Sequence, residues 1–243
     1  MTAAGQAFYE RCKRVLAELD AAEAALDEGR RELVGRLRIT APLLLGRHVI
    51  APLLCRFAAQ HPRLDLEIAF TDRVIDLVEE GFDMGLRAGP LPDSASLAAR
   101  RLGAHDWVIC AAPAYLQQHG MPARAEDFAE HLGIVYRNPG PDSPWEAVGS
   151  EGQSVQLRVR PRLRFDDVQA ICDAALAGHG LARLPRWLAA PHLRARTLAT
   201  VWDGAHRLTT DVHAVWPYTQ HLSMKMRAAV DALAAGVPAL LLG

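Results

Sequence analysis

Hydrophobic residues near the start of the chain recur at alternating spacings of four and three, which is the spacing of a heptad helix. They are Phe8, Cys12, Val15, Leu19, Ala22 and Leu26, with charged residues between them. We interpret residues 1–34 as a dimerisation helix whose apolar seam pairs with a second subunit. The alternative is an amphipathic helix packed on its own domain.

From Leu37 onward the pattern changes to short strands and helices in alternation. LRITAP is a strand cut off by its proline, the apolar spacing over 46–60 predicts a helix, and LDLEIAF at 64–70 alternates like a half-buried strand. A short helix over 73–80 and a strand over 84–87 are predicted next. This order is typical of an α/β fold.

The second half of the chain continues in the same way. DWVICAA at 106–112 is a nearly continuous apolar run and predicts a buried strand that crosses between domains. Asp166 and Asp167 stand at capping positions before a predicted helix over 168–177, and the last helix is predicted over 221–234.

A stripe of arginines lies in the segment LRVRPRLRF. Arg158, Arg160, Arg162 and Arg164 share one face of the predicted strand, and apolar side chains share the other. Pro161 indicates an edge strand, because proline cannot donate to the ladder. The stripe is either an anion-binding surface or a solvated sheet face, and we favour the solvated face.

The charge balance and the cysteine content narrow the possible classes of function and the cellular compartment. Lys and Arg total 27 against 28 for Asp and Glu, so the chain lacks the broad basic field of a nucleic-acid-binding surface. The four cysteines are widely separated and form no CxxC pair, which favours a reducing compartment. Because no signal-peptide pattern or membrane-length apolar stretch occurs, we expect a cytoplasmic protein that does not contact membranes.

The sequence carries no motif for hydrolase, nucleotide or zinc chemistry, so we expect no catalytic residue, metal or cofactor. What remains are positions at strand ends, where an open α/β sheet places its ligand cleft: 40–44, Thr71, Asp72, Arg87, Asp166 and Asp167. Helix N-termini together with Arg87 can hold a carboxylate or another anion there. Helix caps or structural ion pairs are the alternative for each position.

Several motifs recur in an order that resembles the effector-binding domain of LysR-type transcriptional regulators. They are the strand ending in TAP, the HP stop at 61–62, EEGFDMGLR, RRLG, APAYL and GHGLARLP. The heptad helix is similar to the family's linker helix, so the resemblance covers about residues 2 to 235. The winged helix-turn-helix head of the family is not in this sequence, which is then a fragment, a truncated gene or the product of a misplaced start codon.

The resemblance implies a type 2 periplasmic-binding-protein-like fold, with two lobes around a ligand cleft. Lobe I would comprise 35–110 and 214–243, and lobe II would comprise 111–213. A small-molecule effector in the cleft would change how dimers or tetramers hold promoter DNA through the head.

Site residues follow from the resemblance position by position. The expected ligand contacts are Thr40, Pro42, Leu43, Leu44 and Arg87 in lobe I, and Asn138, Asp166, Asp167 and Arg183 in lobe II. Many relatives carry a serine or threonine where this chain has Leu43 and Leu44, so the effector is expected to be partly apolar or to contact the backbone there.

Two other functions are compatible with this fold. A periplasmic solute receptor would need a signal peptide and would have no use for the heptad helix. An enzyme on the same scaffold should show a matched acid, base or nucleophile, and capping already explains Asp166 and Asp167.

Overall fold

The computed structural model describes residues 2, 5, 8, 11, 32–137, 144–149, 151–202, 208–219 and 222–242. Of the predicted heptad seam only Phe8 is described; it is helical, and 71% of its surface is exposed. The rest of the seam lies outside the described residues: Cys12, Val15, Leu19, Ala22 and Leu26. Asn138 of the expected site also lies outside them. No helix in the described part is long and apolar enough to span a membrane.

The chain divides into two compact units. Unit 1 comprises Met1–Leu102 and His213–Val237, and unit 2 comprises Gly103–Val212 and Pro238–Gly243. Two strands, β4 (Leu97–Ala111) and β11 (Thr209–Pro217), contain residues of both units. The lobe limits expected from the sequence stay a prediction.

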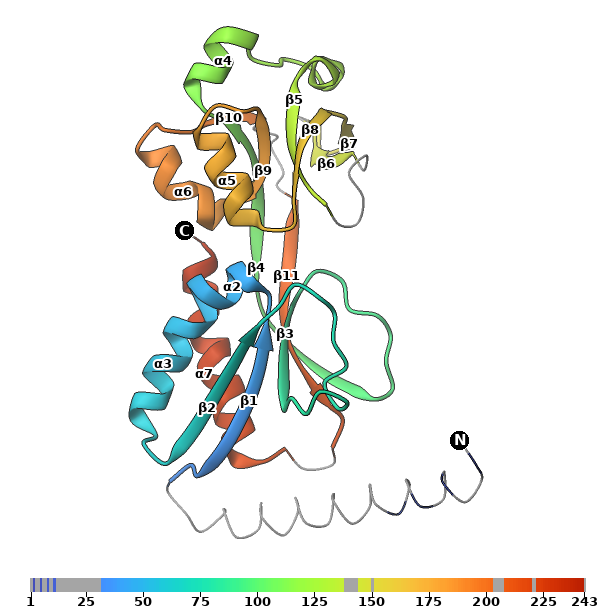
Figure 1. Cartoon of the computed structure of the whole chain (residues 1–243), viewed down its shortest axis with the longest axis vertical. Coiled ribbons are helices and arrows are strands. Elements are labelled where there is room, and N and C mark those ends of the chain that lie inside the picture. Colours follow the sequence, from blue (N-terminus) through green and yellow to red (C-terminus); the bar gives the residue numbers. More distant parts are fainter. Residues whose placement is uncertain are drawn as a thin grey trace. The chain divides into compact units, whose positions relative to one another are not determined.

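Unit 1 is a mainly parallel sheet with helices against it (Figure 1). The strand order is β2, β1, β3, β11, β4, with β1 parallel to β2 and β3. The elements confined to unit 1 are β1 (Gly35–Ala41), α2 (Leu43–Leu45), the π-helical turn η1 (Gly46–Ile50), α3 (Ala51–Gln60), β2 (Leu64–Phe70) and β3 (Met84–Ala88). The last helix, α7 (Met224–Leu241), starts in this unit and packs closely on α3, since a Cβ added at Gly236 would lie 2.3 Å from Leu53.

The two faces of β1 have different roles. Leu37, Ile39 and Ala41 are fully buried, whereas Arg36 and Arg38 point to the opposite face, where Arg38 contacts the end of the segment 71–83. Beyond β1 the chain enters α2 and η1 directly. Gly46 of η1 packs closely on the Phe70 ring, since an added Cβ would lie 2.4 Å from it and the ring would have to shift.

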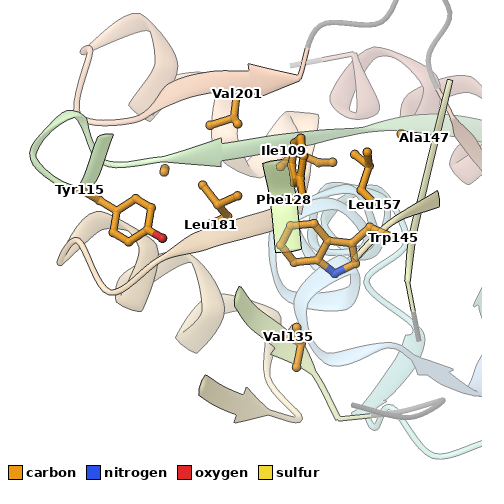
Figure 2. Close-up of a cluster of buried hydrophobic side chains, with 10 residues drawn as sticks. Ile109, Tyr115, Phe128, Val135, Trp145, Ala147, Leu157, Leu181 and Val201 are labelled. Atoms are coloured by element: carbon orange, nitrogen blue, oxygen red, sulfur yellow. The ribbon is translucent and has the colours of Figure 1, made fainter. Parts of the chain in front are cut away.

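Unit 2 is built around strands in the order β10, β4, β9, β5, β8. β5 is parallel to both β8 and β9, and β4 is antiparallel to β9 and β10. The remaining elements are α4 (Pro113–His119), the 3-10 helix η2 (Ala125–Glu130), β5 (Leu132–Tyr136), β6 (Trp145–Val148), β7 (Ser154–Leu157), β8 (Arg160–Phe165), α5 (Val168–Leu176), β9 (Leu181–Pro185), α6 (Arg186–Arg194) and β10 (Ala199–Trp202). Its core gathers Phe128, Trp145, Leu157 and Leu181 around Ile109 of β4 (Figure 2).

The predicted helix over 73–80 is wrong. Its apolar residues do not share a face: Val74 and Val78 are 89% and 63% exposed, whereas Leu77 is buried. Asp76 accepts the amides of Val78 and Glu79 and so forms a single turn instead of a helix. The segment is an extended loop that ends in a turn over 77–81.

Other predicted elements differ in extent. The arginine segment is not one strand, because it breaks after Leu157 into β7 and β8, which belong to different sheets. Within β8 the exposure alternates as predicted, and β8 lies at the edge of its sheet, as Pro161 indicated. The last helix begins three residues later and ends seven residues later than predicted, and it continues through Pro238.

Candidate functional site

Five of the expected ligand contacts gather in unit 1 at the carboxyl ends of β1 and β3. Thr40 is the penultimate residue of β1, and its Cα partner on β3 is Gly85. Arg87 follows two residues later on β3, so it shares a sheet face with Thr40. Pro42, Leu43 and Leu44 continue from β1 into α2.

The backbone around Pro42 is already tied to the end of β2. The Leu43 amide donates to Asp72 Oδ1 at 3.0 Å, and the Thr71 amide donates to the Ala41 carbonyl at 2.9 Å. A carboxylate of the chain therefore occupies the helix N-terminus at which the sequence predicted an external anion. An anionic effector would have to bind beside Asp72 or displace it.

The two leucines differ in exposure. Leu43 is 37% exposed, whereas Leu44 is 9% exposed and belongs to the core. Only Leu43 presents substantial apolar surface.

Thr40 is fully buried, and its hydroxyl has no hydrogen-bond partner within the described part of the chain. Leaving a buried hydroxyl unpaired costs about 1 to 3 kcal/mol. Because buried polar groups in folded proteins almost always have a partner, this hydroxyl marks Thr40 as a position where a bound water or another group could supply one.

Arg87 is half-buried, and burial lowers its pKa below the ordinary value, although the guanidinium stays charged at neutral pH. Its Nη1 donates to the Leu86 carbonyl at 3.0 Å and its Nη2 to the Ile75 carbonyl at 3.4 Å. The guanidinium folds over Gly85, where an added Cβ would lie 3.3 Å from Arg87 Cζ. No carboxylate among the described residues forms an ion pair with it.

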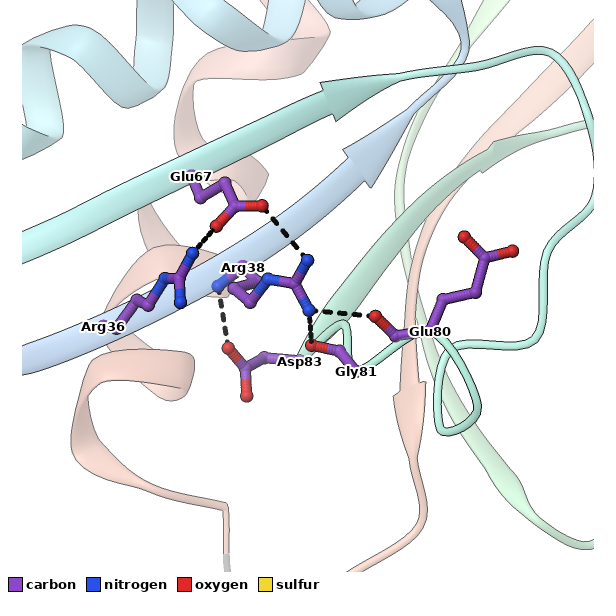
Figure 3. A network of polar contacts seen from close by, with 6 residues as sticks. All are labelled: Arg36, Arg38, Glu67, Glu80, Gly81 and Asp83. Carbon is purple, nitrogen blue, oxygen red and sulfur yellow. Dashed lines mark hydrogen bonds and ion pairs between the residues drawn. The ribbon is translucent and has the colours of Figure 1, made fainter.

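A polar network holds the loop that carries Ile75 against the sheet (Figure 3). Arg38 Nη2 pairs with Glu67 at 3.1 Å, and Nη1 donates to the carbonyls of Glu80 and Gly81 at 2.9 and 2.7 Å. Arg36 contacts the other oxygen of Glu67. The hydrogen bond from Arg38, followed by the Arg36 contact and both charges, lowers the pKa of Glu67.

In unit 2 the two predicted acidic residues have local partners. Asp167 caps α5, accepting the Gln169 amide at 2.7 Å and the Ala170 amide at 3.4 Å. Asp166 forms an exposed ion pair with Arg137 at 3.6 Å. Asp167 is therefore a helix cap in the structure, which is the alternative that the sequence left open for it.

Arg183 lies on β9 opposite Ile109 of β4, so β5 separates it from the acidic pair at the end of β8. Its guanidinium lies 4.6 Å from the centre of the Trp107 ring, and burial lowers its pKa. Its Nε is buried without a hydrogen-bond partner in the described part of the chain. Trp107 was not predicted as a site residue, since the contact joins strands far apart in sequence.

Two further features of the described residues concern metal binding and thiol reactivity. They contain no cluster of three His, Cys, Asp or Glu side chains that could hold a metal ion. Burial raises the pKa of Cys110 to about 12 and that of Cys172 to about 11, so both thiols stay protonated and poorly nucleophilic at neutral pH.

Comparisons with known proteins give a consistent result. Residues 30–238 match the LysR substrate binding domain family. An HTH-type transcriptional regulator of Haemophilus influenzae is 33% identical over 226 residues, which are 93% of this chain and 77% of the relative. The full-length structure of the Vibrio cholerae virulence activator AphB aligns with a TM-score of 0.75 and 25% identity, covering 98% of this chain and 80% of that one. The CrgA regulatory domain of Neisseria meningitidis shares the fold, with a TM-score of 0.74 at 24% identity, covering 84% of this chain and all of that domain.

Proposed function

Because the chain belongs to the LysR family of transcriptional regulators, we propose that it is the effector-sensing part of such a regulator and binds a small anionic molecule. The observation that carries this proposal is Arg87. Within the described part of the chain it is a half-buried cation that donates only to backbone carbonyls, and it shares a sheet face with Thr40, whose hydroxyl is unpaired there. A carboxylate would provide the Arg87 guanidinium with acceptors, and it would reach the fully buried Thr40 hydroxyl only if the residues that cover this hydroxyl moved.

The apolar part of the effector would contact Leu43, which is the exposed leucine of the pair. Pro42 and Leu44 would shape the backbone and floor of the same site. On the second lobe we propose Arg183, backed by Trp107, as a further cation for the effector, with Asn138, Asp166 and Asp167 as weaker contacts. The effector would then bind in the cleft between the lobes that the family resemblance implies.

We propose that the protein acts as a dimer or tetramer and contacts promoter DNA through a winged helix-turn-helix head, in the cytoplasm. Phe8, one residue of the predicted seam, is 71% exposed, as expected for an apolar residue that pairs with a partner subunit. The seam residues Cys12, Val15, Leu19, Ala22 and Leu26 stay a prediction. Size measurement at micromolar concentration, before and after deletion of residues 1–30, tests it: a monomer in both cases would contradict the proposal.

A thermal-shift screen against aromatic and aliphatic carboxylates would identify the effector. A ligand at a hundred times its dissociation constant stabilises the folded protein by roughly 2.7 kcal/mol. The hit should then be titrated against Arg87→Ala and, as a matched control, Arg73→Ala from the exposed loop.

We expect Arg87→Ala to weaken binding by roughly tenfold to a hundredfold, because hydrogen bonds to charged groups contribute about 1.5 to 3 kcal/mol. Arg73→Ala should leave the affinity within about twofold. Equal affinities of the wild type and Arg87→Ala would remove Arg87 from the site. The relatives reported above are transcriptional regulators, and we propose no enzymatic activity.

A further inference from the structure

Unit 2 contains a cavity of about 400 Å³ that the effector proposal does not use. It lies between α4, the start of β5, the middle of β8 and the turn before β9. Because β5, β8 and β9 are parallel, this is the amino-terminal side of these strands, whereas Asp166 and Asp167 follow the carboxyl end of β8. The cavity is therefore at the other end of the sheet from Asp166 and Asp167, and Arg183, in the middle of β9, does not line it.

One wall of the cavity is held rigidly by Tyr115. Its hydroxyl accepts the Leu132 amide at 2.9 Å and lies 3.2 Å from His131 Nδ1. The ring of His119 stacks on the Tyr115 ring at 4.3 Å between centroids, with 14° between the planes. Since both rings are fixed by neighbouring groups, little ordering would accompany ligand binding.

The hydrogen bonds of His119 determine what its ring offers to a ligand. His119 Nδ1 lies 3.1 Å from the Tyr115 carbonyl oxygen, and a carbonyl can only accept. Nδ1 must therefore carry the proton, so Nε2 of the neutral ring is an acceptor. A ligand hydroxyl can donate to it.

The charged group of the cavity is Arg162. The register of β5 with β8 passes from Gly133 and Pro161 to Ile134 and Leu163, so Arg162 is the extra residue of a bulge. Bulges re-aim side chains and are common beside binding sites. Of the four arginines of the exposed stripe only Arg162 lines the cavity, and no carboxylate among the described residues forms an ion pair with it.

We propose that this Arg162 cavity binds a small hydroxylated anion, such as a phosphate ester of a polyol or a hydroxy acid. Arg162 would bind the anionic group by charge-assisted hydrogen bonds, and His119 Nε2 would accept from a hydroxyl. The Gln118 amide and the His179 ring, which also line the cavity, supply further polar contacts. The cavity volume falls within the range of small-molecule sites.

Calorimetric titration with glycerol 3-phosphate, inorganic phosphate and glycerol tests the proposal. Glycerol 3-phosphate should bind with a Kd of about 1 mM or lower and more tightly than either other probe. Arg162→Gln should weaken it by roughly tenfold to a hundredfold, whereas Arg158→Gln, from the same stripe but outside the cavity, should not. No binding by the wild type, or equal loss in both variants, would overturn the proposal, the second outcome indicating only a diffuse effect of the basic surface.

His119→Phe keeps a ring stacked on Tyr115 and removes the acceptor. It should abolish the preference for glycerol 3-phosphate over inorganic phosphate while inorganic phosphate still binds. An unchanged preference would contradict the role of His119. Effector binding should be the same in Arg162→Gln as in the wild type, so failure of this proposal is distinguishable from failure of the effector site.

Discussion

Arg38 and Arg87 extend from neighbouring strands of unit 1 on the same sheet face, but their surroundings differ. Arg38 has a carboxylate partner in Glu67, two carbonyl acceptors and the Phe82 ring at 4.7 Å. Arg87 is half-buried, and its acceptors among the described residues are two backbone carbonyls, one of them at 3.4 Å. The first arginine is used by the fold, whereas the second has hydrogen-bonding capacity that a ligand can use.

This comparison predicts different effects of the two alanine substitutions on stability. Arg38→Ala should lower the free energy of unfolding by about 1 to 3 kcal/mol, because the carbonyls of Glu80 and Gly81 lose their donor and the loop loosens. Arg87→Ala should leave it unchanged or raise it slightly, since it removes a half-buried charge that has no acidic partner among the described residues. Urea unfolding of both variants measures their free energies of unfolding. An equal loss of unfolding free energy in both would contradict the distinction between the two arginines.

A smaller effect is expected from Gly85→Ala, which tests whether the Arg87 guanidinium needs the space over Gly85. The new Cβ would lie 3.1 Å from Leu77 Cδ2 and 3.3 Å from Arg87 Cζ, so the guanidinium must move by a few tenths of an ångström. We expect effector affinity to fall about threefold, with stability changed by less than about 1 kcal/mol.

Gly103→Ala is the matched control, because its Cβ would meet its nearest neighbour, Leu241, at the ordinary distance of 3.4 Å. Effector affinity should be unchanged in this variant. If both glycine variants bound as the wild type does, the guanidinium would not depend on the space at Gly85.

The smallest effect concerns the pH dependence of the Arg38 network. The folded-state pKa of Glu67 is lowered, so its contribution to stability is complete above the ordinary value of 4.5 and is lost as pH falls through the lowered pKa. Glu67→Gln should therefore flatten the acid limb of a stability-against-pH curve, while Asp65→Asn on the same strand should flatten it less. Identical acid limbs in the wild type and Glu67→Gln would show that the pair contributes nothing measurable.

Local patterns predicted those parts of the molecule that local physics decides. The alternation of 64–70 predicted β2, Pro161 predicted an edge strand, and the acidic pair before α5 predicted the Asp167 cap. The helix predicted over 73–80 does not form, because the conformation of this segment depends on Asp76 and on Arg38. Arg38 binds the carbonyls at the end of the segment from 42 and 43 residues away. Helical spacing alone carries no information on such distant partners.

Distant partners also explain why the sequence predicted only part of the candidate site. The strand ends and the family resemblance indicated Thr40 and Arg87, but not that Thr40 is fully buried with an unpaired hydroxyl. Asp72 at the helix N-terminus and Trp107 beside Arg183 are contacts between segments distant in sequence. Burial and long-range partners decide whether a polar residue serves the fold or a ligand, and a single sequence does not contain them.

The most direct test of the role of Arg87 is a thermodynamic cycle with the carboxylate found in the screen and its carboxamide analogue. Both ligands would be titrated calorimetrically against the wild type and Arg87→Ala. We predict a coupling free energy of about 1.5 to 3 kcal/mol between the ligand's charge and the arginine. If the carboxylate and the amide lost the same affinity on removal of Arg87, the coupling would be zero, and Arg87 would not be the group that recognises the anion.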